Sequence, residues 1–282
     1  RWFMEWRTSP DGAVFVTHPW EAGRDNSPDW DTAISMIRPT GIGNYTRRDT
    51  AHVDSSMRPT NADYDRYLWL VQRGKRLHWD EALLVKERPF SVADPTLTFV
   101  LLRANKDLSV MCRALGLPAE EIDRWCQTLE LGCQSLRNPD TGYFNAINLK
   151  TGEHSGHLTN ASFLCWYAGL DDKYMLAALI QSLQDNNYPI PSLDDTSQAF
   201  DGLRYWRGPT WPILNALIGI GLSDLGYFEE SEVLRVKTRE LISQYGFSEY
   251  FHPKTGKPGG GDAFTWTAAV WLAWASPSVG EK

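Results

Sequence analysis

The segment "DPTLTFVLLRANKDLSVMCRALG", residues 94–116, carries helix signals from its first residue to its last. Asp94 can cap the first turn, Pro95 suits the first helical position, and Gly116 suits the residue that follows the last turn. The next segment, 118–136, begins with a proline and early acidic residues, which favour a second helix. Because the connection is short, we expect the two helices to form an antiparallel pair.

The rest of the chain repeats this pattern. Apolar side chains recur at helical spacing in residues 63–76, at Tyr64, Tyr67, Leu68 and Val71. We expect further helices over 158–170, 172–184, 210–226, 228–245 and 262–275, with Pro-x-Thr-Gly turns in 138–144 and 252–261. Convincing strands are scarce, and residues 13–18 are the best candidate. The sequence therefore predicts an all-α protein of antiparallel helix pairs, in one domain over residues 1–282, with function carried by irregular loops.

Composition excludes several classes of protein. The 282 residues are 42% hydrophobic and 22% charged, which is ordinary for a globular protein, and the net charge of -7 argues against a nucleic-acid partner. No apolar run is long enough for a membrane-spanning helix. The four cysteines form no C-x-x-C pair, so we expect reduced, mostly buried thiols and a cytoplasmic protein. The chain begins at Arg1 without Met, so we expect it to be a piece of a longer polypeptide.

The loop "HPWEAGRDNSPDWD", residues 18–31, places carboxylates beside aromatic rings. Loop carboxylates usually cap helices or face water, and this is our interpretation of Asp29 and Asp31. Asp25 differs because a Gly-Arg step precedes it and an Asn-Ser-Pro turn follows it, so that its backbone can be held in place. Asp25 is therefore a candidate catalytic residue.

Two further segments group large polar-tipped side chains around turns. "YWRGPTWPILN", residues 205–215, places Tyr205, Trp206 and Trp211 around a Gly-Pro turn, a grouping that suits sugar binding. "GFSEYFHPKTGKPGGGDAFTWTAAVWLAW", residues 246–274, places Glu249 between aromatic rings and before a glycine-rich loop.

Metal and nucleophile sites find little support in the sequence. The six histidines are dispersed, and the Gly-x-Ser-x-Gly motif is absent. "LDD" occurs at 170–172 and 193–195, where helix or turn capping explains the acids better than Mg²⁺ binding. We expect no metal and no cofactor. A metal-dependent terpene cyclase, which would need Mg²⁺, is kept as an alternative.

The motifs "HPWEAGRDNSP", "YWRGPTWP" and "EYFHPKTGKPGGG" with a later "FTW" occur together and in order. With these motifs the chain resembles the six-hairpin glycosidases of glycoside hydrolase family 63, and most nearly the bacterial mannosylglycerate and glucosylglycerate hydrolases. The resemblance implies an (α/α)6 toroid and hydrolysis with inversion. A full toroid has more helices than the sequence suggests, so we expect the N-terminal helices to be missing from this chain.

The resemblance also implies roles for particular residues. Asp25 matches the general acid and Glu249 the general base. The implied sugar-pocket residues are Trp20, Gly23, Tyr205, Trp206, Arg207, Gly208 and Trp211. Arg58 and Tyr64, in "MRPTNADYDRY", match residues that hold an acidic aglycone.

Inverting hydrolysis fits the candidate carboxylates. It needs two carboxyl groups roughly 6.5–9.5 Å apart across the substrate and a water. The acid should have a pKa raised by nearby rings, whereas the base should stay ionised. We therefore expect Asp25 and Glu249 to face one another, with a small carbohydrate as the partner.

Three alternatives stay open from the sequence. One is a carbohydrate-binding protein without turnover. Another is a trehalase-like hydrolase, which the short "DAFTW" segment after the glycines argues against. Assembly into a homo-oligomer is also left open.

Overall fold

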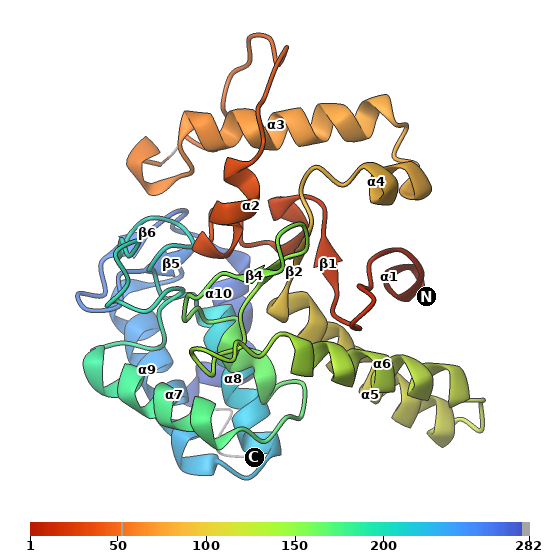
Figure 1. The fold of residues 1–282 in the computed structure, drawn as a ribbon. Helices are drawn as coiled ribbons and strands as arrows, with labels where there is room; N and C mark the ends of the chain where they lie inside the picture. The colour runs from red at the N-terminus through yellow and green to blue at the C-terminus, as the bar shows by residue number, and fades with distance from the viewer. Residues whose placement is uncertain (52, 278–282) are drawn as a thin grey trace. The chain divides into compact units, whose positions relative to one another are not determined.

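Helices are the main elements of the structure, a computed structural model that describes residues 1–51 and 53–277 (Figure 1). The contacts between Cα atoms divide the chain into two compact units. Unit 1 comprises Arg1–Asp25, Asp29–Asn44 and Thr60–Gly156, and unit 2 comprises Asn26–Pro28, Tyr45–Pro59 and His157–Lys282. That the whole chain forms a single domain stays a prediction.

Unit 1 combines helices with four very short strands. In chain order its elements are α1 (Trp2–Trp6), β1 (Phe15–Val16), η1 (Pro19–Ala22), α2 (Asp31–Ser35), α3 (Asn61–Arg76), α4 (Glu81–Glu87), β2 (Val92–Ala93), α5 (Pro95–Ala114), α6 (Glu120–Ser135), β3 (Ile147–Asn148) and β4 (Glu153–His154). The short 3-10 helix η2 (Pro28–Trp30) immediately precedes α2.

The predicted helical pair is confirmed by α5 and α6, which pack along one another (Figure 1). The Asp94 carboxylate accepts a hydrogen bond of 3.0 Å from the backbone N–H of Leu97, and Pro95 occupies the first helical position. A loop also crosses α6 closely. Gly12 has a φ of +92°, and a Cβ there would lie 2.1 Å from the carbonyl oxygen of Thr128, so only glycine fits this crossing.

The predicted strand over residues 13–18 is present as the two-residue β1. It begins an antiparallel sheet in the order β1-β2-β3-β4. Phe15 pairs with Ala93, and Val92 in turn pairs with Asn148. Because β2 ends directly before Asp94, the sheet places the start of α5 beside the segment that carries β1.

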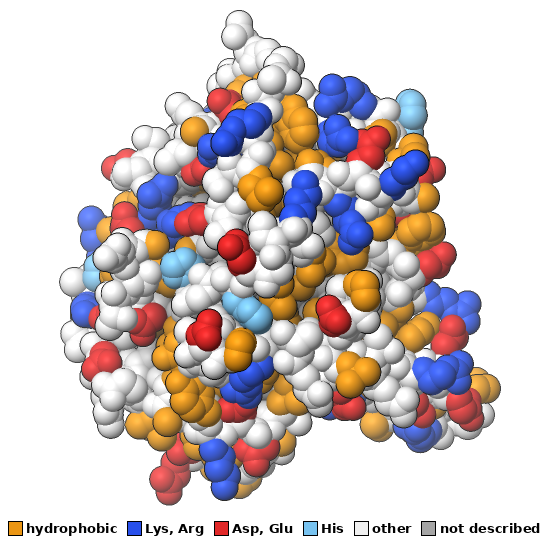
Figure 2. All heavy atoms as spheres, viewed as in Figure 1, with side chains coloured by type: hydrophobic (Ala, Val, Ile, Leu, Met, Phe, Trp, Pro, Cys, Tyr) orange, Lys and Arg blue, Asp and Glu red, His pale blue; other side chains and the backbone are white. Residues whose placement is uncertain are grey.

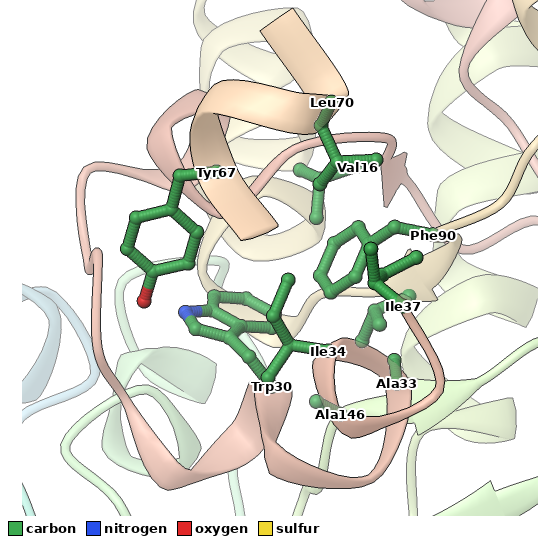
Figure 3. Packing of buried hydrophobic residues seen from close by; sticks show 10 residues of the cluster. Val16, Trp30, Ala33, Ile34, Ile37, Tyr67, Leu70, Phe90 and Ala146 are labelled. Atoms are coloured by element: carbon green, nitrogen blue, oxygen red, sulfur yellow. The ribbon is translucent and has the colours of Figure 1, made fainter. Parts of the chain in front are cut away.

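A hydrophobic cluster fills unit 1 between α2, α3 and the sheet (Figure 3). Trp30, Phe90 and Tyr67 supply its largest rings, each at most 2% exposed. The smaller members of the cluster are Val16, Ala33, Ile34, Ile37, Leu70, Val92 and Ala146. The helix α3 begins at a capping box formed by Thr60 and Asp63, two residues before the predicted range of 63–76.

Unit 2 contains the second helical pair and a short hairpin. Its elements are η3 (Ser55–Met57), η4 (Ser162–Cys165), α7 (Lys173–Asp185), α8 (Pro212–Asp224), α9 (Phe228–Tyr245), β5 (Tyr250–Phe251), β6 (Pro258–Gly259), α10 (Thr265–Val270) and the π-helical η5 (Trp271–Ala275). The helices α8 and α9 pack against one another, as do α10 and α8 (Figure 1). The predicted helices over 172–184, 210–226 and 228–245 are confirmed with small changes at their ends.

The helix predicted over 158–170 is wrong. Only η4 forms there, flanked by a bridge between Thr159 and Leu193. The segment lies under α8, where a Cβ on Gly221 would come within 2.2 Å of the backbone nitrogen of Tyr167. Close packing by α8 and pairing with residue 193 therefore outweigh the local preference for a helix.

Surface charges are mixed in sign (Figure 2), and the thiols are mostly buried, as expected. On the face seen in Figure 2, acidic and basic side chains are interspersed with apolar ones. The four cysteines are free thiols, and all but Cys112 are buried. Burial raises the pKa of Cys133 to about 12, so this thiol stays protonated. In the described part of the chain, none of the helices has the length and apolar character needed to cross a bilayer.

Candidate active site

The loop that carries Asp25 is held at its beginning by His18. The Nδ1 atom of His18 accepts a hydrogen bond of 3.0 Å from the backbone N–H of Trp20, so the ring proton lies on Nε2 and is donated to the carbonyl oxygen of Tyr67 at 3.0 Å. Burial lowers the pKa of His18 to about 4, and the ring is therefore neutral near pH 7. Gly23 then ends η1 with a φ of +67°, a backbone angle that favours glycine. The loop thus turns sharply two residues before Asp25.

A buried ion triad anchors the residue next to Asp25. Arg24 is 2% exposed and binds two carboxylates, Asp29 at 2.7 Å and Asp94 at 2.6 Å. Burial would lower the pKa of Arg24, but the charges of Asp94 and Asp29 outweigh it and raise that pKa. Asp29 also accepts a hydrogen bond of 2.8 Å from the Ser155 hydroxyl. The interpretation of Asp29 as a capping or water-facing carboxylate is wrong, since it is buried and fixes the loop from within the protein.

Two aromatic side chains of the unit 1 cluster hold consecutive backbone carbonyls. The Tyr67 hydroxyl donates to the carbonyl oxygen of Asp25 at 2.6 Å, and the Trp30 indole N–H donates to that of Arg24 at 2.6 Å. Figure 3 shows the polar tips of these two rings side by side at the edge of the cluster. The hydrophobic core therefore sets the path of the backbone at Asp25. The sequence showed Tyr67 only as a member of a helical face, so this role was missed.

Trp20 and Tyr64 lie together in unit 1, with ring centroids 5.9 Å apart. Trp20 is 38% exposed. It lines a cavity of about 360 Å³ whose other walls include Trp2, Leu70 and Trp79. Aromatic walls of this kind suit the apolar face of a ligand.

In unit 2, the candidate base Glu249 is 7% exposed and strongly constrained. Its backbone N–H donates to the carbonyl oxygen of Gly261 at 2.8 Å, and the Thr267 hydroxyl of α10 donates to the carbonyl oxygen of Ser248 at 2.7 Å. Its carboxylate oxygen Oε2 accepts two hydrogen bonds, from Arg58 Nη2 at 3.0 Å and from the N–H of Gly261 at 3.2 Å. The glycine-rich loop noted in the sequence thus serves to hold the carboxylate.

The aromatic segment at 205–211 packs tightly within the same unit. Tyr205 adopts a φ of +44°, which is uncommon for a residue with a side chain, and its ring lies 4.2 Å from the Arg58 guanidinium. Trp206 and Trp211 stack with centroids 3.9 Å apart and planes 6° apart. Both tryptophans are nearly fully buried, whereas Tyr205 is partly exposed. Tyr205 therefore offers the most accessible ring of the three.

Arg207 and Gly208 form the turn that follows. The carbonyl oxygen of Arg207 accepts a hydrogen bond from Asp201 N at 2.8 Å, and Gly208 N donates to the Ser192 hydroxyl at 2.9 Å. A Cβ on Gly208 would lie 2.4 Å from the carbonyl oxygen of Asp201. Close backbone packing therefore explains the glycine at this position.

Several buried donors in unit 2 have no partner among the described residues. Within residues 1–51 and 53–277, no acceptor is present for Trp206 Nε1, Tyr250 Oη, Arg58 Nε or Asn26 Nδ2. Burial raises the pKa of Tyr250 to about 12, so its hydroxyl stays a donor. Buried polar groups normally have partners, and orphaned ones often face a ligand or water. Tyr250 and Asn26 were not among the residues predicted from the sequence. The one sequence signal that could have indicated them is that they directly follow Glu249 and Asp25 in the chain.

The acidic pairs at 170–172 and 193–195 have structural roles, as predicted. Asp172 caps α7 by accepting from Met175 N at 2.9 Å, and Asp194 accepts from Thr196 N at 3.0 Å within a turn. Among the described residues, no cluster of three or more His, Cys, Asp or Glu side chains is arranged to hold a metal ion.

Comparison with known proteins assigns the chain to a family. Residues 1–267 match the model of the mannosylglycerate hydrolase MGH1-like glycoside hydrolase domain. The chain is 39% identical to mannosylglycerate hydrolase MGH1 of Selaginella moellendorffii, over 97% of this chain and 58% of that protein. It is 30% identical to glucosylglycerate hydrolase of Mycolicibacterium hassiacum, over 97% of this chain and 65% of that protein.

A solved structure shows the same fold. It is the glycoside hydrolase family 63 (GH63) mannosylglycerate hydrolase from Thermus thermophilus, in complex with Tris and D-glycerate. It superposes with a TM-score of 0.92 at 35% identity, over 97% of this chain and 68% of that one. The chain thus spans about three-fifths of the length of the curated relatives it matches. On the extent of these matches, the chain belongs to the MGH1-like mannosylglycerate hydrolase domains of glycoside hydrolase family 63.

Proposed function

We propose that this chain carries both catalytic carboxylates of an inverting α-glycoside hydrolase. Its substrate is a small α-mannoside or α-glucoside with an acidic aglycone, mannosylglycerate or glucosylglycerate, the compounds named for its relatives. The carboxylates belong to an (α/α)6 toroid of which this chain supplies a part.

The observation that carries the proposal is the environment of Glu249. A buried carboxylate with two donors on one oxygen is fixed in direction, and its second oxygen, Oε1, accepts no hydrogen bond within the described residues. A general base needs an oxygen of this kind to take a proton from water. The orphaned donors of Tyr250 and Trp206 in the same unit suit the hydroxyl groups of a sugar.

Asp25 is proposed as the general acid of the same reaction. It directly precedes Asn26, whose side-chain oxygen accepts a hydrogen bond from the backbone N–H of Trp206 at 3.0 Å. The carbonyl oxygen of Asp25 is held by Tyr67. A residue whose own carbonyl is held and whose neighbour's side chain is anchored can aim a carboxyl group at a glycosidic oxygen.

The test is hydrolysis by the natural full-length protein, on mannosylglycerate, glucosylglycerate, trehalose and short α-glucans. We expect turnover of one or both glycerates, with NMR of the first product showing the β-anomer of the sugar. Release of the α-anomer would contradict inversion. Turnover of trehalose alone would favour the trehalase-like alternative, and tight sugar binding without turnover would favour a carbohydrate-binding protein.

Substitution of each carboxylate tests its role. Asp25→Asn and Glu249→Gln should each lower kcat by at least about 10²-fold, since acid–base help typically contributes 10² to 10⁴. Asp31→Asn, in the same loop at the start of α2, is the matched control and should retain activity. An α-glycosyl fluoride should restore much of the rate of Asp25→Asn, because fluoride leaves without a proton, but should not restore Glu249→Gln. Full activity in either carboxamide variant would remove that residue from the mechanism.

A further inference from the structure

The two hydrogen bonds to Glu249 converge on the same oxygen atom. Arg58 Nη2 and the N–H of Gly261 both donate to Oε2, at 3.0 Å and 3.2 Å. The side chains of Arg58 and Glu249 are 10% and 9% exposed, so this ion pair is shielded from water. Its geometry therefore orients the carboxylate far more strongly than a surface pair would.

Hydrogen bonds hold the segment that carries Arg58. Asp54 caps η3 through the backbone N–H of Ser56 at 2.9 Å. Arg47 pairs with Asp49 and also donates to the carbonyl oxygen of Pro59 at 2.8 Å. With the Tyr205 ring 4.2 Å from its guanidinium, the Arg58 side chain is fixed at both ends.

Resting on the proposed function, we propose that Arg58 is a positioning residue for the general base. It binds Oε2 and places a positive charge beside the carboxylate, which leaves Oε1 as the oxygen that receives the proton of the attacking water. This differs from the role in aglycone binding that the sequence suggested for Arg58. A guanidinium already engaged with Glu249 serves the reaction on any glycoside, whatever the charge of its aglycone.

The balance of the hydrolytic step is simple. The water oxygen bonds to the anomeric carbon while one water proton passes to Glu249 Oε1, and the bond from that carbon to the leaving oxygen breaks as Asp25 gives its proton to this oxygen. Afterwards Glu249 returns a proton to solvent, and Asp25 regains one. Arg58 keeps all its protons throughout. Burial would lower the pKa of Arg58, but the negative charge of Glu249 outweighs it and raises that pKa.

The experiment compares Arg58→Met and Arg58→Lys with Arg48→Met in the full-length protein. Arg48 is exposed on the same segment and is the control for loss of a positive charge. The substrate is an α-glycosyl fluoride of the sugar that the enzyme accepts, since it has no aglycone carboxylate and needs no acid. The measurements are kcat and KM, with circular dichroism to verify folding.

For Arg58→Met we expect kcat on the fluoride to fall by at least about tenfold, because a misaligned base loses its near-attack geometry. KM for the fluoride should stay nearly unchanged, because in this role Arg58 contacts the base and not the sugar. Arg58→Lys should recover only part of kcat, because its ammonium is a point charge on a flexible stem. Arg48→Met should match the unchanged protein.

The outcomes separate this inference from the proposed function. If Glu249→Gln abolishes turnover of the fluoride but Arg58→Met leaves kcat unchanged, the positioning role is wrong while the proposed base stands. A rise in KM for the glycerate substrates alone would assign Arg58 to the aglycone instead. If Glu249→Gln is fully active on the fluoride, the proposal that Glu249 is the general base is wrong.

Discussion

The Arg24 guanidinium donates to the Asp94 carboxylate at 2.6 Å, and both side chains are almost completely buried. The other oxygen of Asp94 caps α5 through the backbone N–H of Leu97. One carboxylate thus ties the start of the longest predicted helix to the loop that carries Asp25. Burial raises the pKa of Asp94, although the positive charge of Arg24 opposes this rise. The buried Asp94 carboxylate therefore depends on Arg24 as its counter-charge.

Arg24→Met should therefore destabilise the protein strongly. Removing one partner of a buried ion pair costs about 3–5 kcal/mol, because the remaining carboxylates lie buried without a counter-charge. Urea unfolding at pH 7 measures this change in the free energy of unfolding. Arg103→Met is the control, since Arg103 forms a partly exposed pair with Asp107 at 2.9 Å, and such pairs contribute less than about 1 kcal/mol. Similar losses in both variants would show that the triad has no special role.

Tyr67→Phe should affect both stability and catalysis. It leaves the carbonyl oxygen of Asp25 without the hydroxyl donor 2.6 Å away, at a cost of about 1–2 kcal/mol. If Asp25 is the acid, kcat on the glycerate substrates should fall several-fold, while the rate on the glycosyl fluoride changes little. Tyr174→Phe, at an exposed position of α7, should change neither quantity. Equal losses on both substrates would argue against an effect transmitted through Asp25.

Two neighbouring glycines make a sharp test of the geometry at Glu249. Gly260 has a φ of +72°, and a Cβ there would lie 2.2 Å from Glu249 Oε2, whereas a Cβ on Gly261 would meet nothing within 4 Å. Gly260→Ala should therefore displace the carboxylate and lower kcat by about 10²-fold, the loss that a displacement of about 1 Å can cause. Gly261→Ala keeps the N–H donor and should retain most activity. Steady-state kinetics measure kcat for both variants. Equal values would show that the close approach of residue 260 to Glu249 does not affect catalysis.

The neutral His18 should make stability depend on pH. Its pKa in the folded state is about 4, below the unfolded value of 6.5, so only the unfolded chain binds a proton between these values. The contribution is complete above about pH 6.5 and is lost as the pH falls toward 4. The free energy of unfolding should drop by about 2 kcal/mol more between pH 7 and pH 5 than it does in His18→Gln. Burial also lowers the pKa of His252, but His252 is present in both proteins, so the difference isolates His18. Parallel pH dependence in the two proteins would contradict this.

Local signals in the sequence were sufficient to predict most of the longer helices. Capping residues and apolar spacing act within one or two turns of the chain, and they correctly predicted α3, α5, α6, α7, α8 and α9. They failed at 158–170, where contacts with α8 and residue 193 override local preference. The short α1, α2 and α4 were missed because segments of five to seven residues carry little periodicity.

By itself the sequence determined the kinds of residue available for the chemistry: a carboxylate in a turn at Asp25, another at Glu249 before a glycine-rich loop, and rings at 205–211. Tertiary structure alone decided the partners of these groups. Arg58 reaches Glu249 across 191 positions, and Tyr67 reaches the carbonyl of Asp25 across 42. The reason is physical. Spacing along a chain reports only neighbours within a few residues, whereas hydrogen bonds and burial depend on which distant segments the packed core brings together.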